Sequence, residues 1–297
     1  SSKVEYIHLD LASFDSIRKF VDDVHALDDG AISDATKEGS LNILVNNAGV
    51  AWGKDTPYAE TSDGLEEIVG VNHFGTFLLT QLLLEDLKKA KGGARVTIVS
   101  SSLHEKNKMM EKRSKPSSAT DPDEKTEDDD PIKKKLLLPD FPTGILPSSE
   151  NFDGFNSYQV SKLCNLWFAY ELQRRLDDGE AGGSDAKSSV RVNAISPGFI
   201  PSTGLTRRSG TLGKFFLRYV LDSFRYIGMG VTRSPEDGAE VIVQASTSEV
   251  ASTGAQYFEL PRGTSEIVPI ASSDESLDET KAKALWDMSL KTCKLEG

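Results

Sequence analysis

Short apolar runs alternate with segments of helical periodicity along most of this 297-residue chain. Leu41–Val45 is a near-continuous apolar run, as expected of a parallel strand that is covered on both faces. Further strands are expected at Val4–Leu9, Arg95–Ser100, Val190–Ser196 and Ala255–Leu260. Strands that alternate with helices favour a doubly wound parallel sheet with helices on both faces. The pattern therefore predicts an α/β fold of three layers.

The segments between these runs carry the signals of helices. Ser13 is placed to cap a helix whose apolar residues follow the helical period as far as Leu27. Longer helices are expected over Asp63–Lys89 and Tyr158–Leu176, and a terminal one over Leu277–Lys291. At 234–237 a serine, a proline and two acidic residues form a typical helix start.

One segment interrupts the alternation. Residues 104–149 contain blocks of like charge and several prolines, and the carboxylates of Asp121–Asp130 would repel one another in a packed structure. We interpret this segment as a disordered surface insertion. A role in docking a partner is the less favoured alternative, and Leu136–Leu138 could pack back onto the body. Apart from this insertion, residues 1–297 are expected to form a single domain.

Composition excludes several classes of function. A net charge of −12 disfavours nucleic-acid and anionic membrane partners, both of which select for an excess of Lys and Arg. Cys164 and Cys293 lie far apart without metal-type spacing, so we expect no metal site and reduced thiols in an intracellular compartment. No apolar run reaches the roughly 18 residues of a transmembrane helix. Because the chain begins at Ser1, we expect a targeting region to lie upstream, which leaves cytoplasmic and organellar locations open.

Tyr158 and Lys162 are spaced so that a helix places both on one face. At ~4 Å and an effective dielectric of ~20, an ammonium would favour the phenolate by about 4 kcal/mol, or roughly three pKa units. Such a shift would make the tyrosine a general acid and base near neutrality. A pair like this in isolation is more often an ordinary helix surface.

Ser101 follows the strand Arg95–Ser100, at the carboxyl edge where open α/β sheets bind ligands. Its hydroxyl could hydrogen-bond a substrate oxygen and hold it against Tyr158. Ser100 and Ser102 compete for this role, and strand alternation allows only one of the neighbours to face the cleft. The alternative is an ordinary turn.

Other polar residues also fall at strand ends or inside helices. Asn72 lies near the buried side of its helix, where a break or a water site would supply partners for the amide. It could hold a water beside Lys162 and pass protons, although a purely structural role is favoured for a lone Asn. The small residues 46–49, Asn-Asn-Ala-Gly, would let the backbone approach an adenosine closely, unless they form a plain turn. Asp10 could accept a hydrogen bond from adenine or simply begin the turn before Ser13.

Taken together, these residues resemble the short-chain dehydrogenase/reductase family. The motifs are LDLAS around Asp10, NNAG at 46–49, VNHFG around Asn72, IVSS before Leu103, YQVSK at 158–162 and SPG at 196–198. The resemblance implies a Rossmann-like fold and a nicotinamide cofactor, NADP(H) or alternatively NAD(H). It implies Tyr158 as acid and base, Lys162 on the ribose, Ser101 on the substrate oxygen and Asn72 in a proton relay. The cofactor residues would be Asp10, Asn46, Ala48, Gly49, Tyr158, Lys162, Pro197, Gly198, Ser202 and Thr203.

Three stretches are similar to the retinol dehydrogenase and light-dependent protochlorophyllide reductase branch. They are SYQVSKLCNLWFAYELQRRL, SPGFIPSTGLTRR and ETKAKALWDMSLK. Phe199 stands where the protochlorophyllide reductases carry a functional cysteine, and a phenyl ring cannot donate a proton. We therefore favour a dark redox reaction on a hydrophobic carbonyl or alcohol. The alternatives are a light-dependent reductase and a non-catalytic remnant or binding protein.

The resemblance also bears on assembly and completeness. It implies dimerisation through the helices at 63–89 and 158–176. It implies the sheet order 3-2-1-4-5-6-7, in which Val4–Leu9 is the third strand and the first two strands, with their glycine-rich phosphate turn, are missing upstream. We therefore expect an exposed sheet edge and poor cofactor binding by this chain, because the pyrophosphate lacks its helix N-terminus.

Overall fold

The computed structural model describes residues 4–27, 41–51, 57–105, 141–179, 189–198, 200 and 233–295. The predicted insertion at 104–149 falls largely outside these residues, as do Leu136–Leu138, Ser202 and Thr203. The predictions made for those segments are therefore untested by the structure.

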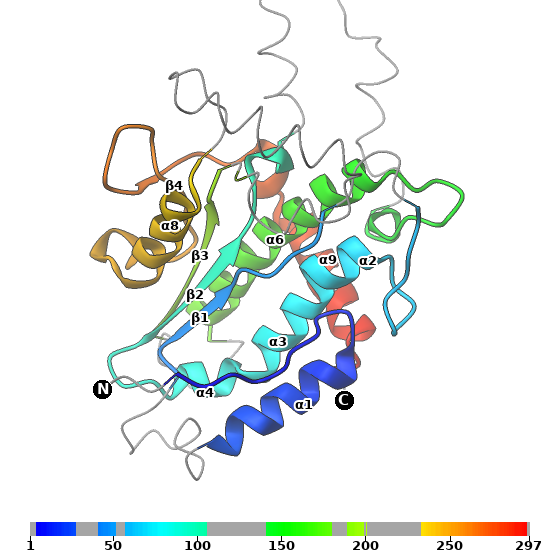
Figure 1. The fold of residues 1–297 in the computed structure, drawn as a ribbon, viewed down its shortest axis with the longest axis horizontal. Coiled ribbons are helices and arrows are strands. Elements are labelled where there is room, and N and C mark those ends of the chain that lie inside the picture. Colours follow the sequence, from blue (N-terminus) through cyan, green and yellow to red (C-terminus); the bar gives the residue numbers. More distant parts are fainter. Residues whose placement is uncertain are drawn as a thin grey trace, which may run out of the picture.

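A five-stranded sheet with the order β1-β2-β3-β4-β5 forms the centre of the fold. The first four strands pair in parallel, and the short β5 pairs antiparallel with β4 (Figure 1). The strands are β1 (Ile43–Asn46), β2 (Ala94–Val99), β3 (Val190–Ser196), β4 (Tyr257–Glu259) and β5 (Val268–Pro269). The parallel sheet predicted from the apolar runs is confirmed, whereas β5 had no signal in the sequence analysis.

Helices cover both faces of this sheet, because successive side chains of each strand point to opposite faces. On β3, Val192 and Ala194 join the core under α6 (Gly154–Asp177), while Ile195 joins a smaller core under α8 (Pro235–Thr247). Figure 1 shows α8 on one side of the sheet and α3, α6 and α9 on the other. The predicted three-layer α/β fold is confirmed.

The remaining elements complete the two helical layers. They are α1 (Phe14–His25), α2 (Glu67–Val69), a π-helix (Gly70–Gly75), α3 (Thr76–Leu82), α4 (Leu84–Lys88) and α9 (Glu279–Thr292), with short 3₁₀ turns at Ser102–His104, Thr143–Ile145, Glu249–Ala251 and Asp274–Leu277. The long helix expected over 63–89 is thus divided. Its interruption at Asn72, expected for a buried amide, is a π-helix, a form that is common at functional sites.

The predicted helix starts are confirmed by their caps. The Ser13 side chain accepts a hydrogen bond from the Ser16 N–H at the start of α1. At α8, Ser234 and Asp237 form a reciprocal capping box with Pro235 in the first turn. Each cap satisfies backbone donors that the helix leaves unpaired at its N-terminus.

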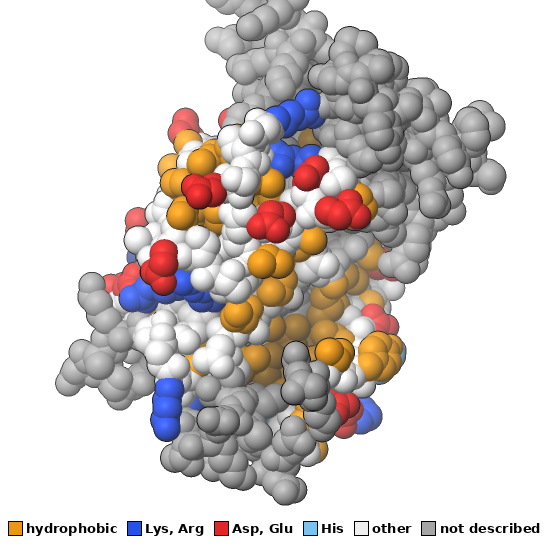
Figure 2. Space-filling view, turned by 60° about the vertical axis from the view of Figure 1, so that its left-hand side comes forward, with side chains coloured by type: hydrophobic (Ala, Val, Ile, Leu, Met, Phe, Trp, Pro, Cys, Tyr) orange, Lys and Arg blue, Asp and Glu red, His pale blue; other side chains and the backbone are white. Residues whose placement is uncertain are grey.

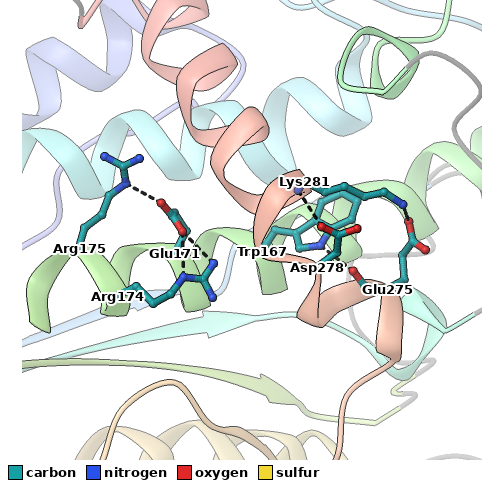
Figure 3. Close-up of polar contacts among 7 residues, drawn as sticks. All are labelled: Trp167, Glu171, Arg174, Arg175, Glu275, Asp278 and Lys281. Atoms are coloured by element: carbon teal, nitrogen blue, oxygen red, sulfur yellow. Dashed lines mark hydrogen bonds and ion pairs between the residues drawn. The ribbon is translucent and has the colours of Figure 1, made fainter. Parts of the chain in front are cut away.

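Helix α9 packs along α6, so that α6 is buried on both sides for most of its length. In Figure 3, the buried Glu171 accepts hydrogen bonds from Arg174 and Arg175. The Arg175 guanidinium also lies 4.6 Å from the centre of the Trp286 ring of α9. A surface predicted to form a dimer is therefore partly covered by the chain's own helix, and the dimer stays a prediction.

The strand predicted at Val4–Leu9 is wrong. Residues 4–10 form no ladder with the sheet, and the side chains of Val4 and Tyr6 are 91% and 89% exposed. A strand needs a hydrogen-bonded neighbour, which an apolar pattern alone cannot supply. Among the described strands β1 lies at the sheet edge, with Ile43 and Val45 partly exposed.

Figure 2 shows apolar side chains gathered around a hollow on one face of the molecule.

Within the described ranges, none of the helices combines the length and the apolar character needed to cross a bilayer.

Gly75 allows the π-helix to lie directly against the backbone of Leu11, because a Cβ at residue 75 would collide with the Leu11 carbonyl oxygen. We expect Gly75→Ala to lower the free energy of unfolding by about 1–3 kcal/mol, as overpacking does. At a helical glycine with free space around it, the same change would instead raise the free energy of unfolding by about 1 kcal/mol. Urea unfolding measures the sign, and a stabilised variant would contradict this packing.

Candidate active site

The carboxyl ends of β1, β2 and β3 meet at one edge of the sheet, since the three strands are parallel. Gly49 lies just beyond β1, Ser101 just beyond β2 and Pro197 just beyond β3. Helix α6 crosses beside this edge and contributes Tyr158 and Lys162. The predicted site is thus assembled from segments that are more than a hundred residues apart in sequence.

Of the three competing serines, Ser101 is the one that meets Tyr158. Its hydroxyl is near enough to the phenol to lower the pKa of Tyr158, and it accepts a hydrogen bond from the Leu103 N–H at 3.2 Å. Ser100 is 2% exposed, and its hydroxyl donates instead to the Lys162 carbonyl oxygen at 2.8 Å. Ser102 is exposed at the start of the following 3₁₀ turn. The structure therefore resolves an ambiguity that strand alternation left open.

Burial sets the acidity of the tyrosine. It raises the pKa of Tyr158 to about 12, and the hydrogen bond from Ser101 opposes this rise. The Lys162 ammonium lies 5.6 Å from the centre of the phenol ring. The expectation that Lys162 brings this pKa toward neutrality is therefore wrong for the free chain. A buried phenolate loses its hydration, and this cost exceeds what the neighbouring ammonium returns.

Lys162 is itself buried, with 4% of its surface exposed. Its ammonium donates a hydrogen bond to the Val99 carbonyl oxygen at 3.0 Å. Burial lowers the pKa of Lys162 to about 8, because the charged form is the one that loses hydration. The lysine therefore remains largely protonated at neutral pH, and the loss of hydration of its buried ammonium destabilises the folded chain.

Asn72 joins the π-helix to the two segments that flank it. Its amide nitrogen donates to the Val50 carbonyl oxygen and to the Ser161 hydroxyl, each at 2.9 Å, while its oxygen accepts from the Val50 N–H. Ser161 in turn donates to the Tyr158 carbonyl oxygen. A Cβ at Gly49 would come within 3.0 Å of the Asn72 oxygen and 3.6 Å of the Lys162 nitrogen. The side chains of Asn72 and Lys162 therefore both lie next to Gly49.

The other predicted cofactor residues are less closely associated with Tyr158. The Asn46 amide donates to the Thr80 hydroxyl and is buried, so that it anchors β1 to α3. The Asp10 carboxylate accepts from the Ala12 N–H and thus shapes its own turn. Gly198 has a φ of +81°, and a side chain there would meet Arg233. Their roles toward a cofactor stay predictions.

Sequence reasoning missed two polar residues of α6 that support the site. Asn165 is 3% exposed and donates to the Val99 carbonyl oxygen at 3.2 Å, the acceptor that Lys162 also uses. Ser161 accepts from Asn72 and is fully buried. Ser161 follows Tyr158 by three residues and Asn165 follows it by seven, so both lie on the helix face of Tyr158 and Lys162. That shared spacing could have identified them.

Residues 1–112 match the family model described as short chain dehydrogenase. The chain is 30% identical over 289 residues to the chloroplastic protochlorophyllide reductase of Marchantia paleacea, covering 95% of this chain and 55% of that protein. It is 30% identical over 282 residues to human retinol dehydrogenase 14, covering 95% and 64%. The chain thus spans between about half and two thirds of the length of these relatives.

Solved structures show the same fold. An uncharacterized protein from Mycobacterium Paratuberculosis is 26% identical with a TM-score of 0.57, covering 96% of this chain and 74% of that one. The 3-alpha-hydroxysteroid dehydrogenase from Pseudomonas sp. B-0831, solved with NADH, is 20% identical with a TM-score of 0.51, covering 84% and 80%.

The lowered pKa of Lys162 predicts a pH-dependent stability. Between about 8 and its ordinary value of 10.5, the unfolded chain binds this proton and the folded chain does not, so folding is favoured as the pH rises. Below about 8 the lysine is charged in both states and its full burial cost is present. Lys162→Met removes this dependence. The unfolding free energy of the variant minus that of the wild type should therefore fall, by on the order of 3 kcal/mol in total, as the pH rises through this window.

Denaturant unfolding at pH 7, 8, 9 and 10 measures the difference. Lys19→Met, at a side chain that is 74% exposed, provides the matched control and should show a flat difference. A flat difference for Lys162→Met as well would show that Lys162 carries no such penalty.

Proposed function

The chain belongs to the short-chain dehydrogenase/reductase family, in the branch of the retinol dehydrogenases and protochlorophyllide reductases, and on this premise we propose that it is an oxidoreductase. It transfers hydride between NADP(H) and a hydrophobic carbonyl or alcohol. NAD(H) is the alternative cofactor. The observation that carries the proposal is the meeting of three groups at one sheet edge: the Ser101 hydroxyl, which acts on the pKa of the Tyr158 phenol, and the buried Lys162 ammonium, 5.6 Å from the centre of the same ring.

The residues at the carboxyl edge of the sheet fit the nicotinamide end of such a cofactor. Gly49 keeps open the space between Asn72 and Lys162, which a side chain would fill. Lys162 would hold the ribose. Gly198 adopts a left-handed backbone conformation that favours glycine, and without a side chain it would let the backbone come close to the cofactor. Ser202 and Thr203 are proposed nicotinamide contacts. When bound, the cofactor donates or accepts the hydride.

Two hydroxyl groups of this chain would act on the substrate oxygen. Ser101 hydrogen-bonds that oxygen and orients the carbonyl, and Tyr158 transfers the proton. Because the pKa of Tyr158 is about 12, the phenol is protonated at neutral pH and holds the proton that carbonyl reduction requires. The free chain therefore starts in the protonation state for reducing a carbonyl. Oxidation of an alcohol would need the phenolate, which the Lys162 ammonium favours.

After Tyr158 has given up its proton, the phenolate must be reprotonated from solvent. Asn72 and Lys162 would assist, since both lie around Gly49 and Asn72 is linked through Ser161 to the Tyr158 backbone. A water held between them would complete the path. This relay is part of the proposal.

The substrate is proposed to be hydrophobic, as the name of the human relative, a retinol dehydrogenase, suggests for that protein. The protochlorophyllide reductases among the relatives favour a second candidate, photoreduction of a tetrapyrrole. Against it, Phe199 replaces the cysteine expected of such enzymes. Cys164, whose counterpart that branch retains, is fully buried, and burial raises the pKa of its thiol. It is poorly placed to deliver a proton.

Tyr158→Phe tests the proposal. We expect it to lower kcat for carbonyl reduction by about 10²–10⁴-fold, the usual contribution of a general acid, with cofactor affinity unchanged. Tyr6→Phe is the matched control, because that side chain is 89% exposed and has no part in the proposed site. Turnover of aldehydes and ketones is followed with NADPH and NADH in the dark and in light.

Each outcome selects one reading. Loss of turnover in Tyr158→Phe with activity retained in Tyr6→Phe supports the oxidoreductase. Turnover only in light would favour the tetrapyrrole reductase. Undiminished turnover in Tyr158→Phe would exclude the proposed acid. A wild-type chain that binds NADPH or NADH and yet shows no turnover under any condition would favour the non-catalytic alternative.

A further inference from the structure

A buried histidine that the proposed reaction does not use lies three residues beyond Ser101. His104 ends the 3₁₀ turn Ser102–His104 and is 6% exposed. Its Nδ1 lies 2.7 Å from the Ser101 carbonyl oxygen, and its Nε2 lies 3.2 Å from the backbone nitrogen of Ser273. The ring therefore joins the active-site serine to a segment 169 residues further along the chain.

These two partners fix the tautomer of His104. A carbonyl oxygen can only accept, so Nδ1 must carry the proton that bonds Ser101. A backbone N–H can only donate, so Nε2 must be unprotonated to accept from Ser273. Neutral imidazole protonated at Nδ1 meets both requirements.

The carbonyl of Ser101 receives a second hydrogen bond, from the His104 backbone N–H at 3.1 Å. Ser101 is extended, with φ −161° and ψ 149°, and immediately precedes the 3₁₀ turn that its own hydroxyl caps. Two bonds to one carbonyl fix the orientation of that peptide plane. This orientation sets the direction of the Cα–Cβ bond of Ser101, and the hydrogen bond that the hydroxyl accepts from the Leu103 N–H then sets the position of its oxygen.

The far side of the His104 ring is also held. Tyr257 of β4 packs edge-on against it, with the ring centres 5.4 Å apart. The segment that contains Ser273 is fastened to α6 by two bonds. The Tyr170 phenol donates to the Ser272 hydroxyl at 2.9 Å. The Trp167 indole N–H donates to the Glu275 carbonyl oxygen at 2.8 Å, as Figure 3 shows. Helix α6 also carries Tyr158. Ser101 and Tyr158 are thus both positioned relative to one helix.

We propose that His104 is a positioning residue, which through its Nδ1–H holds Ser101 in the orientation that presents its hydroxyl to Tyr158 and to the substrate oxygen. This inference rests on the proposed function for its kinetic consequence. It does not rest on that function for its structural consequence, which is the placement of Ser101.

Two substitutions separate the two ends of the imidazole. Asparagine places an amide nitrogen where Nδ1 stands and can still donate to Ser101, whereas glutamine places its amide near Nε2. We expect His104→Gln to lower kcat about tenfold, the value of one hydrogen bond, with little change in KM. His104→Asn should keep kcat within about threefold of the wild type, because the donor to Ser101 is retained. Nicotinamide cofactor affinity should be the same in both variants.

His25→Asn and His25→Gln supply the matched controls. His25 lies on α1, where its Nε2 is 2.7 Å from a carboxylate oxygen of Asp86. The kcat of both His25 variants should equal that of the wild type. Equal loss of kcat in His104→Asn and His104→Gln would overturn the inference, because it would show that ring packing and not the Nδ1 donor matters. Undiminished kcat in His104→Gln would overturn it as well.

A readout without turnover distinguishes this inference from the proposed function. In ¹H–¹⁵N spectra of the full chain, the amide resonances of Ser101–Leu103 should stay near their wild-type positions in His104→Asn and move in His104→Gln. Resonances that stay in place in both variants would refute the positioning role, whether or not the chain turns over. Displaced resonances together with a wild type that reduces no carbonyl would uphold the positioning of Ser101 and reject the oxidoreductase.

Discussion

The burial of α6 between the sheet and α9 is the constraint on which the rest of the structure depends. One side of this helix packs on β2 and β3, and the other carries the contacts of Arg175 and Trp167 to α9 and to the turn before it. A helix held on both sides cannot rotate, so Tyr158 and Lys162 keep a fixed direction toward the sheet edge. Parallel strands bring Ser101 to that same edge, and the site follows from these two facts.

The same burial gives the site its electrostatic character. Removing water raises the pKa of the Tyr158 phenol and lowers that of the Lys162 ammonium, so each group is moved toward its neutral form. The phenol is thereby kept as a proton donor, and the ammonium is retained through its bond to Val99. Burial that opposes charge in both groups is compatible with a site that transfers a proton without a permanent ion pair.

Much of the fold could be predicted because its signals are local. The strand Val190–Ser196 agrees with its prediction residue for residue, because its valines and Ile195 favour a strand and Pro197 and Gly198 directly after it end the run. The cap at Ser234 and the interruption at Asn72 were also predicted. The strand expected at Val4–Leu9 failed because its pairing depends on a distant partner, and β5 escaped notice because two residues carry no periodicity.

The sequence by itself determined the parallel α/β architecture, the spacing of Tyr158 and Lys162 on one helix face and the placement of a serine at a strand end. Only the tertiary structure decided which of the three serines meets the tyrosine and which direction the pKa of Tyr158 takes. It also decided that His104 connects Ser101 with Ser273. Periodicity and caps depend on neighbours within a few residues, whereas burial and hydrogen-bond partners depend on segments that meet only after the chain has folded.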